Sequence, residues 1–322
     1  MSLKKLIKEK FGYDVSELSA WTDETQQELI TRQVTEARTL QLINIQEGVK
    51  GTMDLHTLDD EIIYQDASAC NLTPSGDSVL GKAQITTVPI GWMKGFCNKD
   101  LNGFWAQVAL RAGAMAEDKQ LPFEQAITNY LLQLHALELD KLIWKGDTAL
   151  STGNLSWIDG FDKRFNDSAA VNEANTLGYS SITNANAFEA FWAVYEAASD
   201  NVEGVAEDPM FRIFTSQSNV NKLIKNMFDL NLYHFEPGNT VRNQIQLGAT
   251  GITIEAVNTT GIYAGKANHL TFGTDLKSDS DSYELWYSQD DDQIYVRSKF
   301  RAGVQVPFLN EITKFTLESS PA

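Results

Sequence analysis

The amino-acid sequence predicts a mixed α+β fold, and three observations lead to this prediction. Apolar residues recur at helical spacing through residues 122–145, which indicates one long helix. Glycines separate short β-branched runs in residues 48–98, and roughly the last fifty residues read as consecutive strands. With 322 residues, 43% hydrophobic and 21% charged, the chain has an ordinary globular composition and is long enough for two subdomains.

The charge and cysteine content argue against several classes of protein. The formal net charge is −17, from 43 acidic and 26 basic residues. Because Lys and Arg drive phosphate binding, we do not expect a dedicated nucleic-acid-binding protein, although a container that holds its DNA loosely stays compatible with this charge. Cys70 and Cys97 have neither metal-site nor disulfide spacing, which favours a reducing compartment. Neither a signal peptide nor an apolar membrane span is visible, so we expect synthesis in the cytoplasm.

The first hundred residues predict a helix followed by a long hairpin. Thr22 is placed to cap a helix that continues to about Ile43, either docked on its own chain or reaching a neighbouring subunit. Extended runs at 61–65 and 84–90, with a Pro-Ser-Gly turn at 74–76, predict a β-hairpin. Such a hairpin has little core of its own, so it needs partner surface from this chain or from another copy.

The middle of the chain predicts helices. Residues 101–115 are apolar and Ala-rich, and a second helix is expected from Pro122 to Lys145, about 36 Å long at 1.5 Å per residue. Gly146 is expected to end this second helix.

The second half of the chain predicts alternating helices and strands. We expect a helix through 187–195 capped by Asn184 or Asn186, and a helix capped by Ser216 that runs through Phe228. Strands are expected at 209–214, 251–257, 262–265, 270–272, 283–287 and 293–297, and the last strand, 300–306, is expected to turn at Gly303.

Several motifs come close to a chemical signature without completing it. Residues 76–83 nearly match a phosphate-binding loop, but Ala83 stands where such a loop has the Ser or Thr that binds magnesium. A strand rather than a helix is expected after it, so no helix N-terminus would face a phosphate. Lys82 is therefore expected to be solvated at a hairpin tip. Residues 275–286 lack the glycine and the final Glu of a calcium loop. His56, His135, His234 and His269 have no metal spacing. We therefore predict no catalytic, cofactor-binding or metal-ligating residue, and no cofactor.

Basic and acidic residues are segregated along the chain. Bases gather in the first ten residues (Lys4, Lys5, Lys8, Lys10) and near the C-terminus (Arg297, Lys299, Arg301, Lys314), whereas residues 275–292 are acidic. Two interpretations stay open. In the first, the acidic patch of one subunit pairs with a basic patch of the next, and repetition of this contact closes a ring or shell. In the second, the patches are simply solvated.

Two segments carry a resemblance to a known family. The run Phe300–Val306, and Gly146-Asp147 followed by Asp159-Gly160-Phe161, resemble the major capsid proteins of tailed bacteriophages, which have the Hong Kong 97-type fold. The resemblance implies five segments, listed here in chain order: an N-terminal arm (1–47), an extended hairpin loop (48–98), a peripheral domain with a spine helix (99–150), a mixed-sheet axial domain (151–292), and closing strands that return to the peripheral domain (293–322).

The resemblance also implies a function. The chain is expected to be a structural protein, not an enzyme, that self-assembles as hexamers and pentamers into an icosahedral phage head. The head would enclose double-stranded DNA, contacted non-specifically, with portal, scaffold or decoration proteins as further partners and no membrane. The expected location is the virion, after assembly in the bacterial cytoplasm. The loop of Lys82 is expected to lie over an adjacent subunit, and the basic arm to face inward.

Two alternatives remain open. One is an encapsulin-type nanocompartment, a shell of the same fold that encloses enzymes. The other is an acidic soluble enzyme, for example a carbohydrate-active one with paired acids in a cleft.

Overall fold

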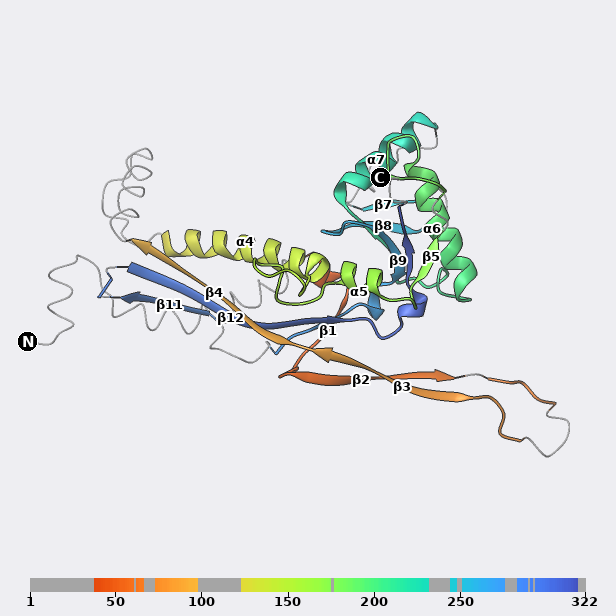
Figure 1. Ribbon diagram of the computed structural model, residues 1–322, viewed down its shortest axis with the longest axis horizontal. Coiled ribbons are helices and arrows are strands. Elements are labelled where there is room, and N and C mark those ends of the chain that lie inside the picture. The colour runs from red at the N-terminus through yellow and green to blue at the C-terminus, as the bar shows by residue number, and fades with distance from the viewer. Residues whose placement is uncertain are drawn as a thin grey trace, which may run out of the picture.

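A computed structural model describes residues 38–60, 62–66, 73–97, 123–174, 177–231, 244–247, 251–275, 283–288, 290–291 and 293–317. Figure 1 shows an elongated lower part, built from a long helix and long strands, and a compact upper part of short strands and helices. The helix predicted before residue 38, the helix predicted at 101–115, Cys70, His234 and the basic N-terminus lie outside the described residues.

The lower part is a five-stranded sheet that runs along helix α4 (Figure 1). Helix α4 spans Phe123–Lys145, as the apolar spacing predicts. The strands are β1 (Asn44–Gln46), β4 (Val88–Cys97), β10 (Thr271–Gly273), β11 (Tyr283–Ser288) and β12 (Gln293–Gln305). Strand β12 is central, because it pairs antiparallel with β4, β10 and β11.

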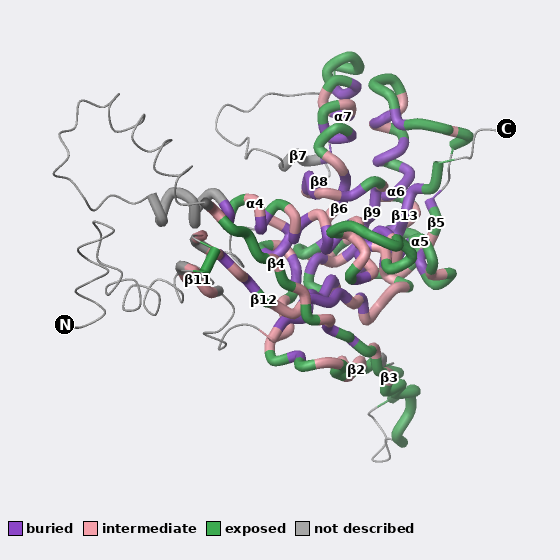
Figure 2. Tube along the Cα trace, turned by 60° about the vertical axis from the view of Figure 1, so that its left-hand side comes forward, coloured by how far each residue is buried: buried purple, intermediate pink, exposed green. Residues whose placement is uncertain are grey.

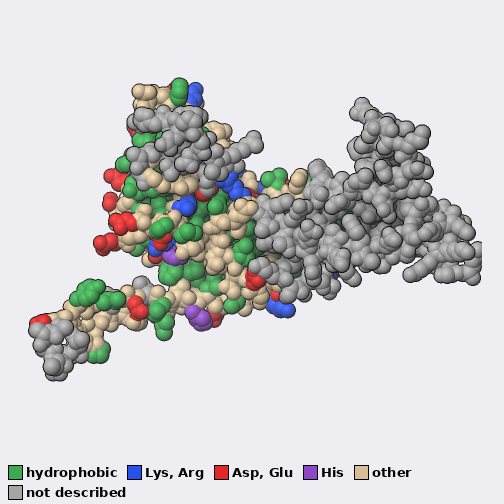
Figure 3. All heavy atoms as spheres, turned by 180° about the vertical axis from the view of Figure 1, so that it is seen from behind, with side chains coloured by type: hydrophobic (Ala, Val, Ile, Leu, Met, Phe, Trp, Pro, Cys, Tyr) green, Lys and Arg blue, Asp and Glu red, His purple; other side chains and the backbone are tan. Residues whose placement is uncertain are grey.

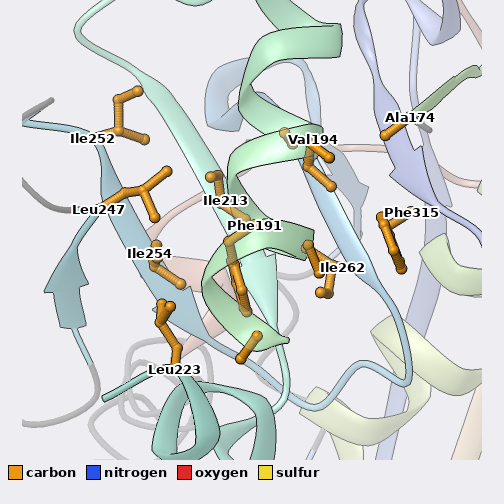
Figure 4. Packing of buried hydrophobic residues seen from close by; sticks show 14 of the residues in the cluster. Ala174, Phe191, Val194, Ile213, Leu223, Leu247, Ile252, Ile254, Ile262 and Phe315 are labelled. Atoms are coloured by element: carbon orange, nitrogen blue, oxygen red, sulfur yellow. The ribbon is translucent and has the colours of Figure 1, made fainter. Parts of the chain in front are cut away.

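The upper part is a six-stranded mixed sheet in the order β5-β13-β9-β6-β8-β7, flanked by helices α6 and α7. The strands are β5 (Asn172–Ala174), β6 (Phe211–Thr215), β7 (Gln244–Gln246), β8 (Thr253–Ala256), β9 (Ile262–Lys266) and β13 (Thr313–Phe315), and the helices are α6 (Ala187–Asn201) and α7 (Gln217–Asp229). Phe191 and Val194 of α6 and Leu223 of α7 pack on Ile213 and Ile254 of the sheet (Figure 4). This cluster is a core separate from the one beneath α4.

The two predicted helix caps differ in outcome. The hydroxyl of Ser216 accepts a hydrogen bond from the backbone N–H of Asn219 at 3.3 Å, so the predicted cap of α7 is confirmed. Asn186 occupies the capping position of α6, but its side chain makes no bond to that helix. It accepts instead from the backbone N–H of Thr183, and so stabilises the preceding turn.

The predicted turn at Gly303 is wrong. Strand β12 continues through Gln305, and Gly303 pairs with Gly273 of β10. A Cβ atom at Gly303 would lie 2.1 Å from the carbonyl oxygen of Thr86. The glycine is therefore needed because the backbone between β3 (Ser78–Thr86) and β4 passes directly over β12.

Other strands join partners that the sequence did not indicate. The strand predicted at 270–272 does not continue the upper sheet, because β10 lies between β1 and β12 in the lower one. Strand β13 pairs with β5 and β9, so the end of the chain belongs to the upper sheet and does not return entirely to the lower part. The prediction that a helix continues to about Ile43 is wrong, because residues 39–41 form a short 3-10 turn, η1 (Thr39–Gln41), and β1 follows it.

Two glycines join α4 to the short helix α5 (Phe161–Asp167). The N–H of Gly160 donates to the carbonyl of Gly146 at 2.8 Å, and a Cβ on Gly160 would lie 2.4 Å from the carbonyl oxygen of Trp144. Next to this contact, the ammonium of Lys163 bridges the carboxylates of Asp147 and Asp159. The Gly-Asp and Asp-Gly pairs that stood out in the sequence thus meet in space and close one loop.

Two buried carboxylates link the lower part of the molecule to the upper part. Asp140 of α4 accepts from the side chain of Asn258 and from the N–H of Thr39. Asp162 of α5 accepts from the hydroxyl of Thr259 and from the N–H of Thr260 at 2.9 Å. Residues 258–260 form the connection between β8 and β9, so both helices hold the same loop of the upper sheet.

Replacing Gly303 with alanine is expected to destabilise the subunit by about 1–3 kcal/mol, because the new methyl group meets rigid backbone at Thr86. Gly81→Ala is the matched control on β3, since its methyl group meets only the rotatable hydroxyl of Thr57. Urea unfolding of both variants measures the difference. Equal stability of the two would contradict the assigned role of Gly303.

Acid is expected to weaken the contact between α4 and the lower sheet through His135. Burial lowers the pKa of His135 from 6.5 to about 4, and its Nδ1 atom accepts from Trp92 Nε1 of β4 at 3.1 Å. Between pH 6.5 and pH 4, His135 is protonated in the unfolded chain but stays neutral in the folded chain. The free energy of unfolding therefore falls by about 2–3 kcal/mol by pH 4.5.

Unfolding of the wild type and His135→Phe at pH 7 and pH 4.5 isolates this contribution. The variant is expected to lose less stability over that interval, because it has no group to protonate at this position. An identical pH dependence in both proteins would show that His135 is not the cause.

Candidate assembly surface

The hairpin of β2 (Thr52–Asp60) and β3 projects from the body of the described chain (Figure 1). The two strands pair antiparallel from Thr52↔Thr86 to Asp60↔Ser78. The predicted hairpin is therefore present, although its first strand is residues 52–60 and not 61–65. The two strands form a sheet of their own. A two-stranded hairpin is at best marginally stable in water without further packing.

The base of the hairpin is fixed to the body of the protein. Ile85 is completely buried, and its side chain lies against Gly273 of β10. The hydroxyl of Thr87 donates to the carbonyl of Val49 at 2.7 Å, and the side chain of Gln305 donates to the carbonyl of Gln84 at 2.8 Å. The direction in which the hairpin leaves the body is thereby set.

Towards its tip the described residues of the hairpin are exposed (Figure 2, lower right), and several of them are large and apolar. Leu58 and Leu80 are cross-strand partners, yet they are 57% and 81% exposed. Tyr64 is 94% exposed. Among the described residues of the hairpin, the exposed large apolar side chains are Met53 near the base and Leu58, Ile62, Ile63, Tyr64, Val79 and Leu80 further out. Exposed apolar side chains gathered on one projecting element are typical of an interaction site.

Apolar groups lie on both faces of the hairpin. Residues two apart share a face of a strand, so Leu80 lies on the face of Lys82, and Val79 on the opposite face with Gly81 and Ala83. A partner could therefore cover either face near the tip.

Lys82 lies on the hairpin and is exposed, but it is in the middle of β3 opposite His56, so its predicted place at the hairpin tip is wrong. Its Nζ atom is 3.4 Å from a carboxylate oxygen of Asp54 on the facing strand. The glycine-rich segment before it belongs to an extended strand and is not followed by a helix. No helix N-terminus is therefore placed there to hold a phosphate, and the rejection of a nucleotide site is consistent with the structure.

Most of the cations near the C-terminus make ion pairs within the chain. Arg297 pairs with Glu284, Arg301 with Asp275, and the buried Lys314 with Glu173. These contacts hold β11, β12 and β13 in place. Of the four cations noted in the sequence, Lys299 is the one left exposed and without an ion pair among the described residues.

Other candidate sites in the sequence do not come together. Of the three histidines in the described part of the chain, His56 lies on β2, His135 packs between Trp92 and Phe300, and His269 contacts Glu311 at 2.8 Å. Among the residues that the structure describes, no three His, Cys, Asp or Glu side chains are grouped to hold a metal ion. No described helix is long and apolar enough to cross a membrane.

The sequence did not reveal the exposed leucines of the hairpin. Strand β2 reads Thr-Met-Asp-Leu-His-Thr-Leu-Asp-Asp, in which apolar residues are spaced irregularly and charges interrupt them. Its alternation is too weak to mark a strand, and its partners on β3 lie further along the chain, from Ser78 opposite Asp60 to Thr86 opposite Thr52. The adjacent Val79 and Leu80 in β3 were the available signal.

No protein-family model and no curated protein sequence matches this chain. Solved structures do match its fold. A chain of the satellite phage P4 procapsid superposes with a TM-score of 0.58 at 13% identity, over 89% of this chain and 98% of that one. The capsid of Myoviridae phage XM1 gives 0.53 at 14% identity, over 86% and 90%.

A third match is a virus-like particle from Pyrococcus furiosus, with a TM-score of 0.51 at 10% identity, over 91% of this chain and 98% of that one. These three matches each cover 86% or more of this chain. The chain therefore has the Hong Kong 97-type fold found in the capsid proteins of tailed phages.

Proposed function

We propose that this chain is the major capsid protein of a tailed phage and assembles as hexamers and pentamers into an icosahedral shell. The observation that carries the proposal is the apolar hairpin, which projects away from its own body on a fold shared with capsid proteins. Burying one large aliphatic side chain contributes about 1.5–3 kcal/mol, so a neighbouring copy that covers Leu58 and Leu80 gains appreciable free energy at each contact.

Each segment of the chain would then have a different place in the shell. The arm (1–47) and the hairpin loop (48–98) would reach neighbouring copies. The peripheral region around α4 would form the continuous wall, and the axial region (151–292) would surround the axis of each hexamer or pentamer. The closing strands (293–322) would join the wall to the axial region, since β12 lies in one sheet and β13 in the other.

The contents and partners of the shell follow from the same proposal. Double-stranded DNA is the expected cargo, held without specific contacts because a net charge of −17 opposes tight phosphate binding. Portal, scaffold or decoration proteins would be further partners. The protein would act in the virion after assembly in the host cytoplasm.

A nanocompartment that encloses proteins is the second candidate. The match to the Pyrococcus furiosus virus-like particle supports it, because the same fold serves there in a particle. The contents of purified particles, DNA or protein, separate the two functions.

The structure supplies a reason to disfavour the glycosidase-like alternative. Asp147 and Asp159 are brought together, but both contact Lys163. Partial burial opposes ionisation of Asp159, yet hydrogen bonds from Thr148 and the Lys163 ammonium hold its pKa at about 2. A group that stays ionised at neutral pH cannot serve as the general acid that such hydrolysis requires.

Replacing Leu58 and Leu80 with serine is expected to stop shell formation while leaving the subunit folded, because both side chains face solvent in the isolated chain. Sedimentation velocity and electron microscopy measure assembly, and thermal unfolding measures stability. Leu58→Met/Leu80→Met is the matched control and is expected to assemble, since it keeps apolar groups of similar size. Normal shells from the serine variant would refute the proposed role of the hairpin.

A further inference from the structure

The chain crosses between the two sheets twice in its C-terminal part, and the two crossings contact each other. The first runs from β9 of the upper sheet to β10 of the lower sheet through the 3-10 turn η2 (Ala267–His269). The second runs from β12 of the lower sheet back to β13 of the upper sheet through the 3-10 turn η4 (Leu309–Glu311). The Nδ1 atom of His269 lies 2.8 Å from a carboxylate oxygen of Glu311, so one side-chain contact joins both crossings.

A proton must lie between these two atoms. Both Nδ1 of His269 and Oε2 of Glu311 are shielded from water. An unprotonated ring nitrogen and a carboxylate oxygen each present a lone pair, so they would repel each other at 2.8 Å. Nδ1 of His269 therefore carries a hydrogen and donates it to Glu311, in the neutral as well as in the charged form of the ring.

Two further charged groups belong to this cluster. Nζ of Lys266, at the end of β9, lies 3.4 Å from the same oxygen of Glu311. Asp208, just before β6, has a carboxylate oxygen 3.9 Å from Nζ of Lys266. Four segments of the chain thus supply two carboxylates, one ammonium and one imidazole. Figure 3 shows acidic, basic and histidine side chains next to one another at the lower border of the upper part.

The surroundings of the imidazole favour its neutral form. The ring of Phe308 packs against it, with centroids 4.9 Å apart. Burial, assisted by the charge of Lys266, lowers the pKa of His269 below its usual 6.5, although the charges of Glu311 and Asp208 act in the opposite direction. When the two crossings separate, the imidazole reaches water and recovers its ordinary pKa. Acid therefore favours the separated form.

We propose that His269 and Glu311 form an acid-sensitive latch, which holds the two crossings together at neutral pH and releases them when the ring gains a second proton. The links made by Asp140 and Asp162 are separate contacts at the connection between β8 and β9. Release of the latch would thus loosen the upper sheet against the lower one without unfolding either core. The latch is a property of the single subunit, so it holds whether or not the chain assembles.

Hydrogen exchange of the isolated subunit at pH 7.5 and pH 5.5, measured by mass spectrometry and corrected for the intrinsic effect of pH, tests the latch. The reporters are the N–H groups of Leu270 and Ile312, which donate to the carbonyls of Ala267 and Leu309 within the two crossings. The separated form takes up a proton near pH 6.5, and the closed form only at lower pH. The protection of both reporters is therefore expected to fall severalfold, up to about tenfold, at pH 5.5.

Three variants separate the latch from other effects of acid. His269→Asn keeps an N–H donor towards Glu311 but does not titrate, so its protection is expected to change less than about twofold between the two pH values. Lys266→Gln removes the cation beside the ring and is expected to show a smaller loss than the wild type. His135→Phe is the matched control, since it removes another buried histidine away from the crossings and is expected to keep the full loss.

Equal protection of the wild-type reporters at both pH values would overturn the inference. A folded His269→Asn variant that loses as much protection as the wild type would also overturn it, because another group would then be responsible. Disappearance of the loss in His135→Phe would assign the acid response to the contact between α4 and the lower sheet, and not to the latch.

Discussion

The buried side chain of Trp144 is the contact on which the arrangement of the molecule depends. Its Nε1 atom donates to the hydroxyl of Thr39 at 2.8 Å, and its ring packs on Phe161 of α5 and Phe214 of β6, with centroids 5.3 and 5.5 Å away. One residue therefore joins the segment before β1, both helices of the lower part and the upper sheet. Since Asp140 and Asp162 hold the connection between β8 and β9 as well, the two sheets are linked at several points, and the hairpin extends from a fixed body.

The apolar residues of the described chain fall into two groups, one buried in the cores and one exposed to solvent. Those around Trp144 and those beneath α6 and α7 form private cores that stabilise the isolated subunit. Those of the hairpin, together with Trp192 and Phe228, face solvent in a single copy. Exposed apolar groups of this kind are typical of a component that becomes complete only in an assembly, because the free energy of burial is then available for association.

Local signals in the sequence predicted the elements well, but not their partners. Helix α4 and the Ser216 cap of α7 depend on nearby residues, so spacing and capping chemistry reveal them. The places of β10 and β13 depend on strands far away in the chain, which a single sequence does not specify. Gly303 was misread because a glycine can serve a turn or a close approach, and only the position of Thr86 distinguishes the two. For the hairpin, which is the main part of the candidate surface, the sequence predicted that a β-hairpin forms but not that its leucines are exposed.

The central claim is that the hairpin is covered by another copy of the chain, and imaging assembled particles by cryo-electron microscopy tests it most directly. The account predicts closed shells in which the hairpin of each copy lies on its neighbour, with Leu58 and Leu80 removed from solvent. Shells in which the hairpin extends into solvent or folds back on its own subunit would contradict the account.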